Sequence, residues 1–305
     1  MRDAYLKFEM CGIIGVAYSK PNDGLGKVIV NMAEALQHRG RDSAGFAIYG
    51  GTTLGENEYM ITVEARGKTD DIYRAITAEI KRQEELSKEV RRYTVFASSY
   101  AHVVEIVEDL NRLPGVAVLG GGKFEMIKDI GEVKAMDAKF RISARHGTHG
   151  LGHTRFSTES CVDRYHAHPF QSYVYPDITV VHNGQITNCL LLRRKLEAKG
   201  HRFSTDNDTE VIVHYVADKL NLGYGLEEAL EESVKDMDGP FTYVIATRES
   251  VGIVKDKLAL RPGIIYQTKD MFAAASEKVA LESISADGPF EVLTSGEHRV
   301  FEVGQ

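Results

Sequence analysis

Met10-Cys11-Gly12-Ile13-Ile14-Gly15-Val16 is the stretch of sequence that decides the fold. Residues 11–19 have the apolar, β-branched centre of a short buried strand. Taken alone, Cys11 would be a small buried apolar residue, because unpaired cysteine is among the most buried residue types. The methionine directly before it supports a second interpretation. If Met10 were removed, Cys11 would carry a free α-amine beside its thiol.

A free α-amine would let Cys11 act as a nucleophile without a separate histidine. An α-amine titrates at about 7.7–8.0 and a cysteine thiol at about 8.5, so the amine is a suitable base for the thiol at neutral pH. A peptide nitrogen cannot do this. We therefore expect residues 1–10 to be a leader that the active protein lacks. Residues 1–10 could be a propeptide that the protein cleaves from itself. We prefer the alternative that translation starts at Met10 and that an aminopeptidase removes this methionine.

The segments after Cys11 alternate between strand and helix patterns. Apolar residues at helical spacing predict a helix over 25–36, and 43–51 is typical of a strand that ends in a glycine turn. The pattern then changes, and we expect an α/β insertion at about 56–122. Its expected elements are a charged helix over 70–92, a strand over 93–98, a helix over 102–113 and a strand over 116–122.

After Lys123 the chain again alternates between apolar strand patterns and helix patterns, with strands first, then helices, then strands. The chain beyond Gly239-Pro240 reads as strands again. Strands, then helices, then strands indicate an α+β fold with antiparallel sheets rather than repeated βαβ units. The expected elements before Gly239 are strands over 150–158 and 178–188 and helices over 188–199, 206–220 and 226–237.

Composition and charge exclude several classes of protein. The 305 residues include 37 Lys and Arg against 44 Asp and Glu, a formal charge of −7, so no broad positive field would attract nucleic acid. No apolar stretch approaches the roughly 18 residues of a membrane span, and the first ten residues are too charged for a secretory signal. Three cysteines fit a reducing compartment. We expect a cytoplasmic protein that binds neither nucleic acid nor membrane.

Two histidine-rich stretches, HGTHGLGH (146–153) and HAH (166–168), raise the question of a metal site. Imidazole suits zinc, copper and iron. However, no Cys-x-x-Cys or His-Glu-x-x-His pattern accompanies these histidines. We therefore expect no metal.

His182-Asn183-Gly184 lies at the end of an apolar strand. Read alone, Asn-Gly favours a turn. The alternative is an oxyanion hole, in which the Asn183 side-chain amide and the Gly184 backbone N–H donate to a developing negative charge.

Six motifs occur in one order along the chain: MCGIIGV (10–16), HRGRDSAG (38–45), HTRFST (153–158), AHPF (167–170), VVHNGQITN (180–188) and DNDTEVI (206–212). Together they resemble the class II glutamine amidotransferases, which are N-terminal-nucleophile hydrolases. The resemblance extends to the glutaminase parts of amidophosphoribosyltransferase and of glutamate synthase. It covers residues 11–55 and about 125–305, so the insertion departs from the family pattern.

The resemblance implies a four-layer αββα fold, in which two packed antiparallel sheets are covered by helices. It also implies that Cys11 attacks the side-chain amide of glutamine. A γ-glutamyl thioester would form, the α-amine would deliver a proton to the departing ammonia, and water would release glutamate. Asn183 and Gly184 would hold the oxyanion in both steps.

The resemblance further implies the residues that bind glutamine. Arg155 would bind the α-carboxylate, which suits a planar guanidinium. Thr158 would add a hydroxyl contact, and Asp208 would pair with the α-ammonium group. Arg39 and His168 match family positions that line the site, where we expect a structural or positioning role. A surface ion pair is the alternative interpretation of Arg155 and Asp208.

A free-standing glutaminase implies a partner that accepts ammonia, because the sequence leaves no room for a synthase domain. Our first choice is a separate glutamate synthase subunit that carries FMN and iron–sulfur clusters, as in a split, archaeal-type enzyme, or the related N-methylglutamate synthase. This chain would hold no cofactor itself. The alternatives are an ammonia donor to another synthase, such as a relative of amidophosphoribosyltransferase, and a non-catalytic glutamine-sensing or scaffolding subunit.

Overall fold

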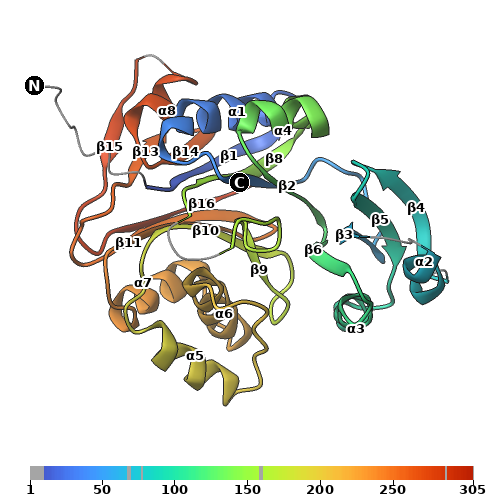
Figure 1. Ribbon diagram of the computed structural model, residues 1–305. Helices are drawn as coiled ribbons and strands as arrows, with labels where there is room; N and C mark the ends of the chain where they lie inside the picture. The colour runs from blue at the N-terminus through green and yellow to red at the C-terminus, as the bar shows by residue number, and fades with distance from the viewer. Residues whose placement is uncertain (1–9, 67–69, 77, 158–160, 286, 305) are drawn as a thin grey trace, which may run out of the picture.

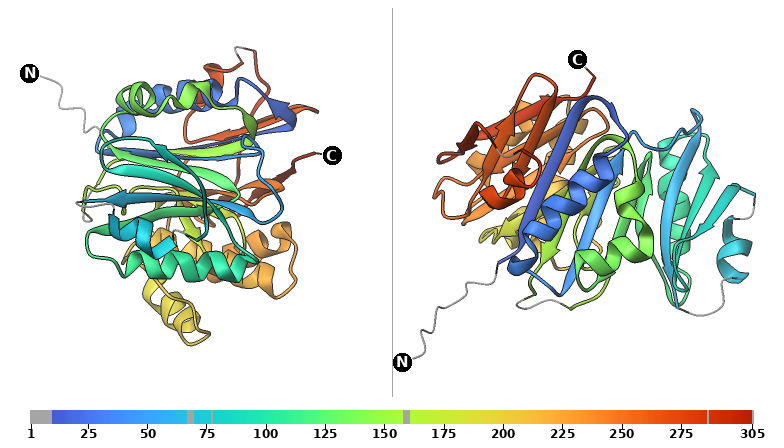
Figure 2. Two further views of the ribbon diagram at one scale, coloured as in Figure 1. Left: turned by 90° about the vertical axis from the view of Figure 1, so that its right-hand side faces the viewer. Right: turned by 90° about the horizontal axis from the view of Figure 1, so that it is seen from above.

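Two packed antiparallel sheets lie between two layers of helices in the computed structural model (Figure 1). The structure describes residues 10–66, 70–76, 78–157, 161–285 and 287–304. A third, smaller sheet lies to one side of these layers, as the view from above shows (Figure 2).

The first sheet has seven strands, in the order β15-β13-β14-β1-β8-β2-β7. Its outer face is covered by α1 (Leu25–Ala35), α4 (Val133–Phe140) and α8 (Lys278–Glu282), whose apolar side chains share one core with those of the sheet. The strands are β1 (Gly12–Asn22), β2 (Ser43–Tyr49), β7 (Phe124–Ile130), β8 (Gly147–Arg155), β13 (Ile264–Gln267), β14 (Met271–Ala275) and β15 (Phe290–Val292).

The second sheet has five strands, in the order β16-β12-β11-β10-β9. Side chains such as Ile13, Val181 and Phe272 fill the space between the two sheets. The predicted αββα arrangement is therefore confirmed. The strands are β9 (Phe170–Ser172), β10 (Ile178–Gly184), β11 (Phe241–Ala246), β12 (Ser250–Lys255) and β16 (His298–Glu302), and the covering helices are α5 (Cys189–Glu197), α6 (Asp208–Asn221) and α7 (Leu226–Asp236).

The third sheet lies within the range expected for the insertion and has its own apolar core. Ile61, Tyr93 and Val103 are fully buried in that core. The strand order is β4-β5-β3-β6, with β3 (Glu58–Ala65), β4 (Ile80–Glu85), β5 (Val90–Phe96), β6 (Val116–Gly122) and the helices α2 (Asp70–Ile76) and α3 (Tyr100–Asn111).

The helix predicted over 70–92 is wrong beyond Ile76, because the charged segment forms the antiparallel pair β4 and β5. Glu84 lies opposite Arg92, and Glu85 lies opposite Arg91. Charges that looked like a solvated helix face instead pair across strands and occupy an edge strand, where charged residues are common. Strand β7 and helix α4 had no counterpart in the predicted elements.

Strand register brings the sequence motifs together. Gly12 at the start of β1 lies opposite Thr154 near the end of β8, and Ser43 at the start of β2 lies opposite Arg155. Cys11, directly before β1, and Arg155, the last residue of β8, therefore lie at the same end of two adjacent strands.

His149 links the two large sheets and predicts a pH dependence of stability. Its Nε2 lies 2.7 Å from the Thr247 carbonyl, its Nδ1 lies 2.9 Å from the Thr148 hydroxyl, and its ring stacks on Tyr49. Burial lowers the pKa of His149 to about 4, although the Thr247 hydrogen bond opposes the shift. The unfolded chain, with a histidine pKa of about 6.5, therefore binds the proton more readily.

We expect the contribution of neutral His149 to be complete above pH 6.5 and to be lost as the pH falls toward about 4. A His149→Gln variant should show a flatter pH dependence of the free energy of unfolding in that window. The difference in slope should reach about 1.4 kcal/mol per pH unit at most. Urea unfolding of both proteins at several pH values measures this, and parallel curves would contradict it.

Candidate active site

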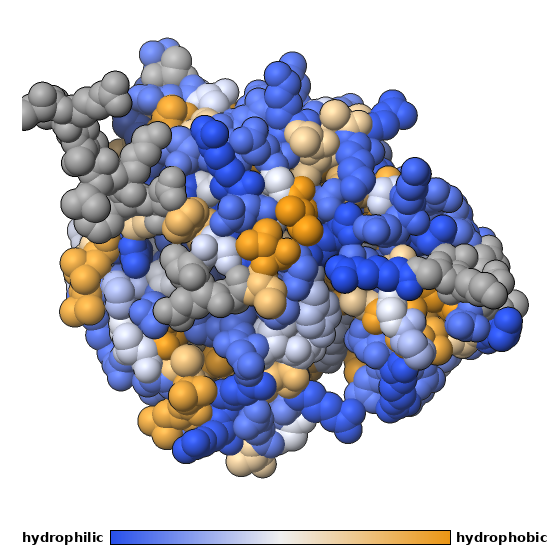
Figure 3. All heavy atoms as spheres, in the orientation of Figure 1, coloured by the Kyte–Doolittle hydropathy of each residue, from blue (hydrophilic) through white to orange (hydrophobic). Residues whose placement is uncertain are grey.

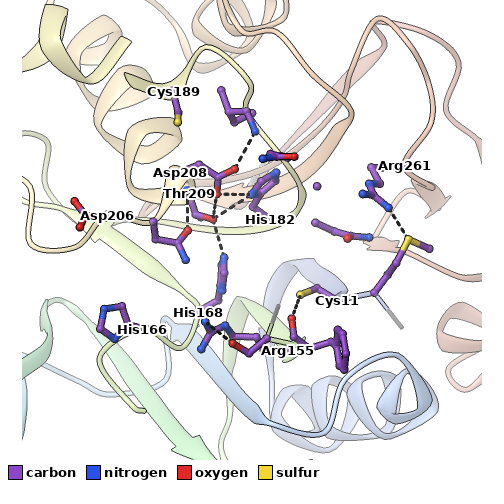
Figure 4. A pocket seen from close by; sticks show the side chains of 18 of the residues that line it. Cys11, Arg155, His166, His168, His182, Cys189, Asp206, Asp208, Thr209 and Arg261 are labelled. Carbon is purple, nitrogen blue, oxygen red and sulfur yellow. Dashed lines mark hydrogen bonds and ion pairs between the residues drawn. The ribbon is translucent and has the colours of Figure 1, made fainter. Parts of the chain in front are cut away.

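A cavity of about 690 Å³ lies where the start of β1 and the ends of β8 and β10 meet the start of α6 (Figure 4). Arg39 does not line it, although it was expected to. Thr158 lies outside the described residues. The other predicted residues all line the cavity: Cys11, Arg155, His168, Asn183, Gly184 and Asp208.

Cys11 is half-buried at the cavity, and its Sγ donates to the Phe156 carbonyl at 3.6 Å. Arg39 holds the Cys11 backbone, because its Nε donates to the Cys11 carbonyl at 2.9 Å while its Nη1 pairs with Glu277. Among the described residues, no histidine nitrogen lies within hydrogen-bond distance of the thiol. The described residues therefore contain no Cys–His pair that could activate the Cys11 thiol.

Burial raises the pKa of the Cys11 thiol, and the positive charges of Arg155, Arg39 and Arg261 only partly oppose this. The thiol is thus protonated at neutral pH while Met10 is attached. A nearby base is needed to form the thiolate, which is the reactive species. The Nη1 of Arg261 lies 2.6 Å from the sulfur of Met10, the residue attached to the Cys11 nitrogen (Figure 4).

The last two residues of β10, Asn183 and Gly184, have a free side-chain donor and a backbone conformation that favours glycine, respectively, as far as the described residues show. The Asn183 side chain is buried, and its Nδ2 has no hydrogen-bond partner among the described residues. Gly184 has φ of 140°, and a Cβ atom there would lie 2.1 Å from the Pro240 carbonyl oxygen. Only glycine fits this position. The Asn183 amide is therefore a donor held ready at the cavity wall, which is what an oxyanion hole requires.

Asp208 begins α6 and is held by three groups. Its Oδ2 accepts the Ile186 backbone N–H at 2.9 Å, and its Oδ1 lies 3.6 Å from His182 Nδ1. Burial would raise the pKa of Asp208, but His182 and the Ile186 and Thr209 N–H groups outweigh it and lower the pKa overall. The carboxylate is ionised at the cavity, as a site for an ammonium group requires.

Arg155 is buried, with 3% of its surface exposed, which contradicts the alternative that it belongs to a surface ion pair. Its Nη1 donates to the Cys161 carbonyl at 2.8 Å, and its Nη2 contacts the Ser157 hydroxyl at 3.4 Å. The guanidinium is thus fixed at the cavity by the segment that follows β8.

Sequence reasoning missed the roles of His182, Thr209 and Arg261, which also line the cavity. The Thr209 hydroxyl lies 2.8 Å from His168 Nε2 and 3.1 Å from His182 Nδ1, so one side chain joins both rings. Burial lowers the pKa of His168 well below its usual value, so this ring is neutral. His182 and Thr209 stand inside the motifs VVHNGQITN and DNDTEVI, which was the available clue for these two, whereas Arg261 lies outside the six motifs.

Among the described residues, no group of three or more His, Cys, Asp and Glu side chains is placed to hold a metal ion. Of the helices that the structure describes, none combines the length and apolar character that a membrane span needs. The expectations of a metal-free and cofactor-free chain stay predictions.

The four-layer fold is that of the N-terminal-nucleophile hydrolases, and Cys11 directly precedes the central strand of one sheet. A family model described as glutamine amidotransferase domain matches residues 153–283. A protein of Methanothermobacter thermautotrophicus, provisionally named glutamine amidotransferase, is 48% identical over 96% of this chain and 100% of its own length. The glutamine amidotransferase-like protein GlxB of Rhizobium meliloti is 34% identical over 90% of this chain and 92% of its own.

Among solved structures, the glutamine phosphoribosylpyrophosphate amidotransferase from B. subtilis superimposes with a TM-score of 0.63 at 19% identity. The match covers 96% of this chain and 47% of that one, so this chain spans about half of its length. The chain belongs to the class II glutamine amidotransferases.

Proposed function

We propose that this chain is a glutaminase subunit that hydrolyses the side-chain amide of L-glutamine and passes the ammonia to a separate synthase subunit. One observation carries the proposal. Cys11 and the Asn183 amide, which has no hydrogen-bond partner in the described part of the chain, line one cavity, together with a glycine position that no other residue can fill. This combination provides a nucleophile and an oxyanion site in the same space.

The cavity also suits the two charged ends of glutamine. Arg155 supplies a buried guanidinium for the α-carboxylate, and Asp208 supplies an ionised carboxylate for the α-ammonium group. The side-chain amide would then extend toward Cys11. Thr158 is proposed to add a hydroxyl contact.

Chemistry begins when the free α-amine of Cys11 takes the thiol proton. The thiolate attacks the amide carbon of glutamine, and Asn183 and Gly184 donate to the oxyanion. When the tetrahedral intermediate collapses, the α-ammonium group returns the proton to the leaving nitrogen and ammonia departs. Water then attacks the γ-glutamyl thioester through a second oxyanion, which frees glutamate and restores the thiol.

The partner is proposed to be a glutamate synthase or N-methylglutamate synthase subunit that carries FMN and iron–sulfur clusters. Two pairs of exposed leucines lie next to cavity residues in the chain and support a docked partner: Leu190 and Leu191 follow Cys189, and Leu258 and Leu260 precede Arg261. Hydrophilic side chains dominate the face drawn in Figure 3, and hydrophobic side chains form small separate groups on it. Co-purification of the native protein, followed by identification of its companion, tests this part.

Asn183→Ala tests the oxyanion site. Because the amide would donate mainly to charge that develops in the transition state, kcat for glutamate release should fall by about 10²–10³-fold while KM changes little. Asn188→Ala is the matched control, since the Asn188 amide already donates to the Asp236 carbonyl at 2.9 Å and does not line the cavity. An Asn183→Ala protein with unchanged kcat would refute the assignment.

A further inference from the structure

The segment 161–166 separates the glutamine cavity from a second, smaller cavity. Cys161 and His166 line the first cavity. Asp163 and Tyr165 line the second, of about 240 Å³, whose other wall belongs to the third sheet. The same short segment therefore faces glutamine on one side and the third sheet on the other.

Arg164, in the middle of this segment, makes three close ion pairs with three different parts of the chain. Its Nη1 lies 2.6 Å from Glu64 in β3 and 2.7 Å from Glu89 in the turn between β4 and β5. Its Nε lies 2.7 Å from Asp129 in β7 of the first large sheet. Arg164, Glu64 and Asp129 are all buried. One guanidinium thus ties the segment to the third sheet and to the main fold at once.

The segment also has an internal ion pair and a hydrogen bond to Arg155, the side chain proposed to bind the α-carboxylate of glutamine. Asp163 accepts the His166 backbone N–H at 2.7 Å, and its carboxylate lies 2.8 Å from the His166 ring. Three residues before Arg164, the Cys161 carbonyl accepts a hydrogen bond from Arg155 at 2.8 Å. A fixed Arg164 therefore fixes the carbonyl that orients the Arg155 guanidinium.

We propose that the third sheet positions the wall of the glutamine cavity through Arg164, which makes Arg164 a positioning residue for glutamine binding. This inference rests on the proposed function, because it takes glutamine as the ligand of the larger cavity. It assigns a role to a part of the chain that departs from the family pattern. Buried ion pairs suit this purpose, since their geometry is specific even where their net contribution to stability is small.

A second ion cluster supplies a control. Arg92 in β5 pairs with Glu125 in β7 at 2.7 Å and with Glu84 in β4 at 3.2 Å. Arg145 lies 3.5 Å from Glu125 and 3.6 Å from Glu84. This cluster also joins the third sheet to the main fold, but it includes no residue of the segment 161–166.

The decisive comparison is between Glu89→Gln and Glu84→Gln. Both glutamates are about half exposed and each pairs with a buried arginine, yet only Glu89 contacts Arg164. The dissociation constant of glutamine is measured by calorimetry in the Cys11→Ala background, so that nothing turns over. The fully active proteins give kcat and KM separately. Arg164→Gln and Arg164→Lys complete the set, with thermal unfolding as the check on folding.

We expect the glutamine dissociation constant to rise by about two- to fivefold in Glu89→Gln. In Arg164→Gln it should rise by about 10-fold to 10²-fold. Arg164→Lys should be intermediate, Glu84→Gln should match its parent, and KM should follow these constants while kcat changes much less. If Arg164→Gln fails to fold, the inference is tested by comparing the glutamine dissociation constants of Glu89→Gln and Glu84→Gln.

Unchanged binding in Glu89→Gln and in folded Arg164→Gln would overturn the inference, as would an equal loss in Glu84→Gln. A parent protein that binds glutamine without hydrolysing it would sink the proposed function but still allow this test. A parent protein that binds no glutamine overturns both.

Discussion

Cys11→Ala is expected to abolish glutamate release from glutamine while glutamine still binds. The substitution removes the sulfur that forms the thioester and keeps Arg155 and Asp208 in place, because the Cys161 carbonyl holds the first and the Ile186 N–H holds the second. Loss of a covalent nucleophile should cost at least about 10⁴-fold in kcat. Glutamate release measures the first effect, and calorimetry with glutamine measures the second.

Alanine substitutions of the other two cysteines at the cavity are the matched controls. Cys161 and Cys189 also line it and are unpaired. Burial raises the pKa of Cys189, so its thiol is protonated at neutral pH. Cys161→Ala and Cys189→Ala should therefore retain turnover. Normal turnover by Cys11→Ala would end the proposed mechanism, and loss of turnover in either control would move the nucleophile away from Cys11.

Retention of Met10 is expected to remove most of the activity. With Met10 attached, the nitrogen of Cys11 is a peptide nitrogen and cannot accept the thiol proton. The described residues offer no histidine nitrogen within hydrogen-bond distance of the thiol as a substitute. General base catalysis is worth about 10²–10⁴-fold, so a protein that keeps Met10 should lose at least that factor.

The experiment compares two proteins. One is produced with Cys11 as its first residue, and in the other the removal of Met10 is blocked. Intact mass confirms the N-terminus of each, and glutamate release gives the rates. The pH profile of the active form should show a group that must lose its proton near the α-amine value of about 7.7–8.0. Equal rates from the two proteins would show that the α-amine is not the base.

The two large sheets could be predicted from the sequence because each motif stands at a strand end or helix start. The β-branched run after Cys11 forms β1, and Asn207 caps α6 through a hydrogen bond to the Thr209 N–H. The segment 70–92 could not be assigned correctly, because its charges suit a helix surface as well as an edge strand. Only the pairing of β4 with β5 distinguishes the two.

In the candidate site, too, some residues could be predicted from the sequence and others could not. Residue types and motif order predicted Asn183 and Gly184, and the structure adds the reason that only glycine fits at 184. Thr209 and Arg164 could not be assigned a role from sequence, because their contacts involve partners 27 to 100 residues away. Arg39 does not line the cavity, but it donates to the Cys11 carbonyl, which agrees with the structural or positioning role expected of it.

Labelling with an electrophilic glutamine analogue tests the central claim most directly. Protein with a confirmed Cys11 N-terminus is incubated with the analogue, and the modified peptide is identified by mass spectrometry while glutamate release is followed. The account predicts one label per chain, on the sulfur of Cys11, with activity lost in proportion and glutamine protecting against both. A label on Cys161 or Cys189 that accompanies the loss of activity, or full activity in protein labelled at Cys11, would contradict it.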